Sequence, residues 1–317
     1  MNRKIFMRRA GSILPPLLRK GGAFYAKGCK TLYAHIRTSN ILCVYLGLFV
    51  LPTLIAFTLF FIIPFIMGIV LSFCKFTTVT DAKFVGFSNY KKAFEDTVFR
   101  HSFWYTALFA VASLIIINAV AFALASALTK NMRGTNIFRT IFFMPNLIGG
   151  IVLGYIWQLI FNGILEKYGT ALALNEWYGF WGLIILVSWQ QIGYMMIIYI
   201  AGLQSIPGDV MEAAQIDGAG KWTKLFKVTI PMMMPSITIC MFLSLTNGFK
   251  LFDQNLSLTA GEPSKMSEMM ALNIFNTFYG RTGWEGVGQA KAVLFFVLVV
   301  AISMIQLHMT RSKEVQQ

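Results

Sequence analysis

The sequence predicts an all-α, polytopic membrane protein with six transmembrane helices. Apolar residues make up 56% of the 317-residue chain and charged residues only 13%, about half the charged share of soluble globular domains. Long apolar runs recur along the chain, and a helix needs about 20 such residues to cross the hydrocarbon core of a bilayer. Basic residues also collect in alternate connections between these runs, as they do in membrane proteins.

Six apolar runs are the predicted spans. They lie at 41–73, 102–129, 140–162, 180–206, 232–249 and 292–310. The first contains Pro52 and Pro64, which can kink a membrane helix, and it is longer than the bilayer requires. The third contains Gly150 and Gly154, whose spacing suits close contact with another helix.

The distribution of charge predicts the sidedness. Residues 1–40 hold nine Lys and Arg and no acidic residue, and basic residues recur in the connections 130–139 and 203–231 and in the tail 311–317. Basic connections stay in the cytoplasm, so both termini are expected there. The predicted organisation is a basic tail (1–40), a six-span domain (41–310) and a short tail (311–317). The net charge of +14 is explained by this topology, and no nucleic-acid partner is expected.

Residue patterns for catalysis or metal binding are missing from the sequence. Its four cysteines are scattered without a Cys-x-x-Cys pair, and its three histidines are isolated, so neither a metal site nor a disulfide framework is indicated. There is no Gly-x-x-x-x-Gly-Lys-Ser/Thr motif for ATP and no hydrolase motif. The chain is therefore expected to be neither an ATPase nor another enzyme, and to bind no cofactor itself.

The polar segment 205–231 between the fourth and fifth spans carries the most information. Pro207 suits the start of a helix, and Glu212 places negative charge near its N-terminus. Two small residues, Ala213 and Ala214, let a partner surface approach closely, and Gly218 permits a sharp exit. The segment is expected to be a short docking helix.

Glu212-Ala213-Ala214 followed by Asp217-Gly218 resembles the EAA loop of permease subunits in ABC importers, which docks on an ATPase. Other stretches resemble the maltose-type sugar permeases in the same order along the chain. They are Asn89-Tyr90, Phe138–Pro145, Ile156-Trp157, Phe249–Asp253 and Leu258–Pro263. The resemblance covers roughly residues 45–310.

This resemblance implies the type I importer fold in a bacterial or archaeal cytoplasmic membrane. It implies a second permease subunit, two ATPase subunits that bind ATP and magnesium, and an external sugar-binding protein. Coupling to the ATPases would involve Glu212, Ala213, Ala214, Asp217 and Gly218. The sequence departs from the family at Glu262, where a glycine is usual, and at Ile230-Pro231, where Leu-Pro is usual.

Polar and aromatic residues in the spans are candidates for a sugar pocket. Lys250 and Asp253 are singled out because ionisable groups in a membrane are costly and are often functional. The aromatic and amide candidates are Tyr155, Gln158, Trp189, Gln190, Gln191, Tyr194 and Asn247. The same residue types also gather at membrane interfaces and bond helices together, so the sequence leaves both roles open.

The predicted function is the permease half of an ATP-driven importer that moves a di- or oligosaccharide by alternating access. One alternative is an ion-coupled secondary transporter, which usually places acidic residues deep in several spans. Another is an ABC permease for a different solute, such as a glycerol phosphodiester.

Overall fold

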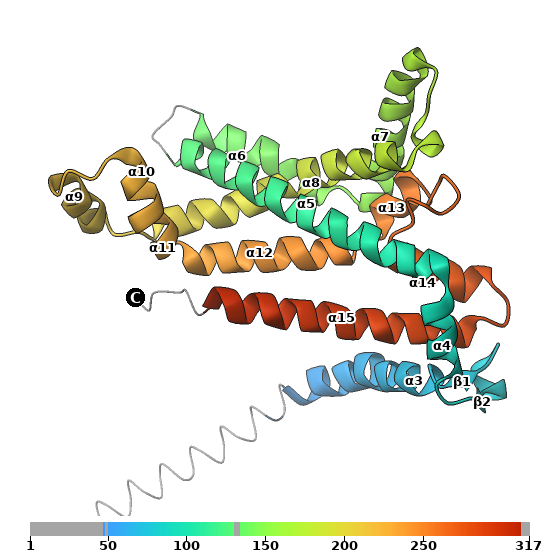
Figure 1. Ribbon diagram of the computed structural model, residues 1–317. Helices are drawn as coiled ribbons and strands as arrows, with labels where there is room; N and C mark the ends of the chain where they lie inside the picture. The colour runs from blue at the N-terminus through green and yellow to red at the C-terminus, as the bar shows by residue number, and fades with distance from the viewer. Residues whose placement is uncertain (1–46, 48–49, 130–133, 312–317) are drawn as a thin grey trace, which may run out of the picture. The chain divides into compact units, whose positions relative to one another are not determined.

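The computed structural model describes residue 47 and residues 50–129 and 134–311 (Figure 1). The predicted tail 1–40 and nearly all of the tail 311–317 lie outside these residues. The chain forms two compact units, Met1–Met67 and Gly68–Gln317.

The helix that leaves the first unit runs from Val50 to Leu71. It contains a π-helical segment, Thr58–Ile62, and continues as α3 (Ile63–Leu71). Ile63 donates its backbone N–H to Thr58, five residues back. The wider turn directly precedes Pro64, whose ring would clash with the carbonyl four residues back in a regular helix. The predicted effect of this proline is therefore absorbed by a local change of helix type.

The second unit is built around three long helices and a shorter one that packs against them. These are α5 (Thr97–Leu128), α8 (Glu176–Gln204), α12 (Met234–Phe249) and α15 (Glu285–Arg311). Figure 1 shows α12 lying between α8 and α15, and α5 packs on both α8 and α12. Fully buried side chains such as Phe109, Leu183 and Met195 fill the core between α5, α8 and α12.

A polar contact also joins these three helices inside the core. Asn118 on α5 accepts a hydrogen bond from the Tyr199 hydroxyl on α8 (2.7 Å) and donates one to Ser244 Oγ on α12 (3.0 Å). Such bonds hold helices together where the surrounding lipid provides no hydrophobic drive for association.

Two bends interrupt the helices, one inside the predicted third span and one at the start of the predicted fifth span. α6 (Thr135–Phe143) meets α7 (Gly150–Leu165) at about 100°, through the 3₁₀ turn Met144–Leu147. The second bend, of 73°, separates α12 from the segment formed by α10 (Lys221–Lys224), the π-helical Leu225–Thr229 and α11 (Ile230–Met232). Within the described residues, four helices can cross a membrane unbroken, and six crossings result if each bent pair is one span.

The segment just before the second bend repeats the proline arrangement of the first span. Ile230 donates its N–H to Leu225, five residues back, and Pro231 follows directly. In both places the residue before a proline closes a π-type turn. After Pro64 the helix continues to Leu71, whereas after Pro231 α11 ends at Met232, where the chain bends.

The short elements lie at opposite ends of the second unit (Figure 1). One end carries β1 (Cys74–Lys75) paired antiparallel with β2 (Lys83–Phe84), α4 (Ser88–Glu95) and α14 (Met270–Gly280). The other end carries α9 (Gly208–Ile216) with α10 and α11. A turn precedes α4: Gly86 adopts a φ of 59°, and α4 begins two residues later.

The predicted small-residue face on the third span is also confirmed. α13 (Asp253–Leu258) packs directly on α7. A Cβ added at Gly150 would lie 2.8 Å from Asp253 Cβ, and one at Gly154 would lie 1.7 Å from Ser257 Oγ. Only glycine allows this approach.

Candidate functional site

The segment predicted as a docking helix forms α9, with Pro207 as the residue just before its first turn. Every residue of α9 is at least partly exposed, and Ile216 is 86% exposed. The chain leaves the helix through Gly218, whose φ of +74° favours glycine. Glu212 and Ala213 lie on the exposed surface, as a docking role requires.

The stability of α9 requires an explanation because isolated helices shorter than about 12 residues are marginal in water. The helix also exposes the apolar side chains of Val210 and Ile216. A partner surface that covers them would supply the missing packing. Because α8 ends at Gln204, four residues before α9, a displacement of α9 would pass directly to the core.

The candidates Trp189 and Gln190 lie on α8 beside the break between α6 and α7. Gln190 donates its amide to the Ile148 carbonyl (3.1 Å) and accepts a bond from the Gln254 amide (2.7 Å). The Trp189 ring meets Trp157 of α7 edge to face, with centroids 5.5 Å apart. The structure thus brings α7, α8 and α13 together around an amide pair and an indole pair.

Gln254 and Trp157 were not among the predicted pocket residues. The sequence carries no separate signal for Gln254, which directly follows the charged Asp253 at the end of a predicted span. Trp157 stands out in the sequence only through its family resemblance. Both become candidates because the fold places them against predicted pocket residues.

The two ionisable candidates of the fifth span, Lys250 and Asp253, lie just beyond the end of α12. α12 ends at Phe249, Lys250 is its C-cap and Asp253 begins α13. The two residues therefore lie on different elements, and no ion pair joins them among the described residues. Both side chains are exposed at the end of the fifth span.

The remaining candidates are spread over three helices. Gln158 on α7 donates to the Leu258 carbonyl (3.1 Å), which ties α7 to the end of α13. Tyr155 on α7 and Tyr194 on α8 are exposed, and Asn247 on α12 is half-buried. Gln191, next to Gln190, is buried, and its amide oxygen has no hydrogen-bond partner among the described residues.

A buried charge cluster, which the sequence did not reveal, lies at the end of the unit that carries α14. Lys291 of α15 is fully buried. Its Nζ donates to Asp96 Oδ2 (2.8 Å), Asn273 Oδ1 (2.9 Å) and Thr277 Oγ1 (2.8 Å), and it lies over the Phe99 ring. The cluster joins the start of α5, the middle of α14 and the first turns of α15.

Asp96 has two further roles in this cluster. It caps α5 by accepting bonds from the backbone N–H of Val98 and Phe99, and it pairs with Arg281 Nη1 at 3.2 Å. Burial opposes ionisation of the carboxyl, but the hydrogen bond and charge of Lys291 outweigh it, so the pKa of Asp96 is lowered. The carboxylate is therefore charged at neutral pH.

The loop between α13 and α14 contains the predicted departure at Glu262. The Glu262 carboxylate accepts the Ser264 N–H (2.9 Å), and its backbone carbonyl accepts the Ser267 hydroxyl (2.5 Å). Asn255 anchors the same loop by donating to the Ser267 carbonyl (2.8 Å) and accepting the Met269 N–H (2.9 Å). Glu262 thus stabilises the turn through its own side chain.

Comparison with known proteins places these features in a family. Residues 119–314 match the family of binding-protein-dependent transport system inner membrane components. The chain is 43% identical over 277 residues to a probable starch degradation products transport system permease protein of Thermoanaerobacterium thermosulfurigenes, covering 85% of this chain and 94% of the relative. It is 28% identical to a trehalose/maltose transport system permease protein of Thermococcus litoralis, covering 83% and 92%.

A solved structure supports the fold. The crystal structure of a bacterial ABC transporter that imports the acidic polysaccharide alginate contains a chain that matches with a TM-score of 0.73 at 20% identity. The match covers 89% of this chain and 99% of that one. The chain therefore has the fold of an ABC importer permease and belongs to the family of binding-protein-dependent transport system inner membrane components.

Proposed function

We propose that this chain is the transmembrane permease subunit of an ATP-driven importer for a di- or oligosaccharide. The observation that carries the proposal is α9, a helix with no buried residue that carries the EAA sequence at one end of the bundle. The names of the relatives, which refer to starch degradation products and to trehalose and maltose, indicate the substrate class.

The proposed assembly contains a second permease subunit, two ATPase subunits and an external sugar-binding protein. The ATPases would bind ATP and magnesium. The chain would cross the cytoplasmic membrane of a bacterium or archaeon six times, with both bent pairs counted as spans and both termini in the cytoplasm. With both termini in the cytoplasm, α9 would lie on the cytoplasmic side of the membrane and α14 on the external side. The two helices lie at opposite ends of the second unit.

The mechanism follows from the connections of α9. Closure of the ATPase dimer on ATP would displace α9, and the displacement would pass to α8 and, through α10 and α11, to α12. These helices carry the candidate pocket residues Trp189, Gln190 and Asn247. Movement of α8 against α12 would open the pocket outward to the loaded binding protein, and hydrolysis would reset it.

The observed placement of Asp253 favours this function over an ion-coupled secondary transporter. Such a transporter usually places acidic residues deep in several spans. Asp253 instead begins α13, beyond the end of α12. The buried Asp96 lies at the N-cap of α5, also at an end of a helix.

The docking role is tested by Glu212→Lys in the complete importer. We expect normal membrane insertion but lost sugar uptake, because the reversed charge opposes docking or uncouples transport from ATP hydrolysis. Uptake and copurification of the ATPase are the measurements. Glu166→Lys, at another exposed acidic residue after α7, is the matched control and should transport normally. Normal uptake by the Glu212 variant would refute the docking assignment.

The partners are tested by mass spectrometry of proteins that copurify with the tagged chain from native membranes. An ATPase and a second permease subunit are expected. Recovery of this chain alone or as a homo-oligomer would contradict the proposed assembly.

A further inference from the structure

The helix α14 has two faces with different environments. On one face Asn273 and Thr277 are buried and hold Lys291, and the N–H of Met270 donates to Thr106 Oγ1 on α5 (2.9 Å). Glu268, just before the helix, is also buried and accepts bonds from the amides of Asn273 and Asn276. This face fixes α14 to the bundle.

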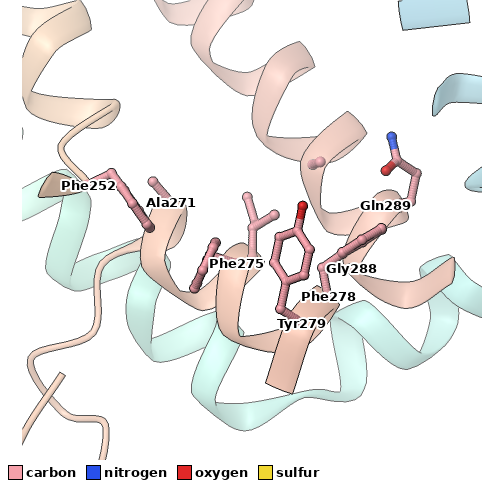
Figure 2. Close-up of a pocket in the computed structure, with 9 residues that line it drawn as sticks. Phe252, Ala271, Phe275, Phe278, Tyr279, Gly288 and Gln289 are labelled. Carbon is pink, nitrogen blue, oxygen red and sulfur yellow. The ribbon is translucent and has the colours of Figure 1, made fainter. Parts of the chain in front are cut away.

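The other face of α14 lines a cavity of about 390 Å³, shown in Figure 2. Four aromatic rings form much of its wall: Phe252, Phe275, Phe278 and Tyr279. Phe275 lies between Phe252 and Tyr279, with ring centroids 5.2 Å and 4.9 Å away. Small residues, including Ala271 on α14 and Gly288 and Ala292 on α15, complete the lining.

The polar groups of the cavity are uncharged. The Gln289 carboxamide and the Tyr279 hydroxyl provide donors and acceptors, and Tyr279 is 73% exposed. No charged side chain lines the cavity among the residues that the structure describes. Flat apolar rings with a few neutral hydrogen-bonding groups are suited to a ligand that has both C–H faces and hydroxyl groups.

The position of the cavity favours a carbohydrate over a lipid chain. Gln289 is the fifth residue of α15, so it lies only about 6 Å along the axis from the start of that helix. The cavity is thus at the end of the bundle and not beside its middle, where acyl chains pack. Phe252 also lies between the exposed Lys250 and Asp253 in the sequence, just after the end of α12.

We propose that this cavity is an external carbohydrate subsite, which holds one end of an oligosaccharide while the other end enters the pocket between the spans. The inference rests on the proposed function and adds a second binding position to it. The buried cluster on the opposite face of α14 keeps the aromatic wall in place before the ligand arrives, which reduces the cost of ordering it on binding.

The subsite predicts a dependence on substrate length. A disaccharide would fill only the pocket between the spans, whereas a longer chain would reach both positions. In the complete importer, reconstituted with its binding protein, we expect Phe275→Ala to raise KM for oligosaccharides of five or more sugars about tenfold. A tenfold change corresponds to about 1.4 kcal/mol of lost binding. The KM for the disaccharide should change less than twofold.

Two variants with smaller changes test the subsite even if Phe275→Ala fails to fold. Tyr279→Phe removes one hydroxyl group and Gln289→Leu removes one amide, and both should also weaken transport of the longer sugars selectively. Phe94→Ala is the matched control, because Phe94 is an exposed phenylalanine on α4 at the same end of the bundle but outside the cavity lining. It should transport all lengths as the wild type does.

Three outcomes would overturn the subsite. They are an unchanged KM in all cavity variants, an equal change for every sugar length, and a lipid that copurifies with the wild type and is lost from Phe275→Ala in native mass spectrometry. If the wild-type importer moved no sugar of any length, the proposed function itself would fail. The two failures are therefore distinguishable.

Discussion

Lys291 Nζ lies 2.8 Å from Asp96 Oδ2, although the two residues are 195 positions apart in the sequence. The contact fastens the start of α5 to the first turns of α15, and Asn273 and Thr277 add α14 to the same cluster. A fully buried lysine is stable here because each donor of its ammonium group has a partner. This arrangement provides the first prediction.

Lys291→Met should destabilise the protein by about 3–5 kcal/mol, the usual cost of removing one partner of a buried ion pair. The double variant Lys291→Met with Asp96→Asn should recover part of the loss, because no unpaired buried carboxylate remains and asparagine can still cap α5. Thermal unfolding of the purified protein measures both. Lys91→Met removes an exposed pair with Glu95 and should leave the unfolding temperature unchanged. An equally small effect of Lys291→Met would show that the cluster is not stabilising.

The stability of the protein at acid pH should depend on the ionisation of Asp96. Its folded-state pKa lies below the ordinary value of 3.8, so the stability that it contributes is complete above that value and is lost as the pH falls through the lowered pKa. Wild-type stability should therefore decrease in acid below about pH 4, and Asp96→Asn should remove this component. Unfolding temperatures of the two proteins across the acid range test the prediction, and parallel curves would contradict it.

Gly154→Ala should weaken the packing of α7 on α13. An added Cβ would lie 1.7 Å from Ser257 Oγ, so the helices must separate, at a cost of about 1–3 kcal/mol. Gly163→Ala on the same helix is the matched control, since its Cβ would meet nothing within 4 Å and should be tolerated. Thermal unfolding distinguishes the two variants. Equal stability of both would mean that α7 and α13 are not in close contact.

Gln190→Ala should alter substrate selection without disturbing assembly. The change removes the carboxamide that bonds to the Ile148 carbonyl and to the Gln254 amide. It therefore weakens the contact of α8 with the start of α7 and with α13. Uptake competition among sugars measures selection, and copurification of the ATPase checks assembly. A variant with unchanged selection would remove Gln190 from the candidate pocket, and Gln254→Ala then tests its partner separately.

The membrane helices and the docking segment could be predicted because their signals are local. Apolar runs of sufficient length indicate α5, α8 and α15, and the pattern from Glu212 to Gly218 indicates α9. The bends could not be located in the same way. The turn between Phe143 and Gly150 occurs inside one continuous apolar run, and hydropathy does not distinguish a straight helix from a broken one.

The candidate site was predicted only in part. Trp189 and Gln190 lie at one place with polar and aromatic neighbours, whereas Lys250 and Asp253 lie beyond the end of α12. Lys291 was placed outside the last span, although it lies within α15 and is fully buried. Its partner Asp96 could not be inferred from spacing, because the two are far apart along the chain.

Hydrophobic length, charge distribution and a short motif are properties of neighbouring residues, so the sequence alone predicts a helical membrane protein and the exposed segment that forms α9. Only the tertiary structure decided which distant residues share a cluster, where the helices bend, and that one face of α14 is fixed while the other lines a cavity. These features depend on the packing of helices against each other, and a membrane helix is equally apolar on the faces that meet lipid and those that meet protein.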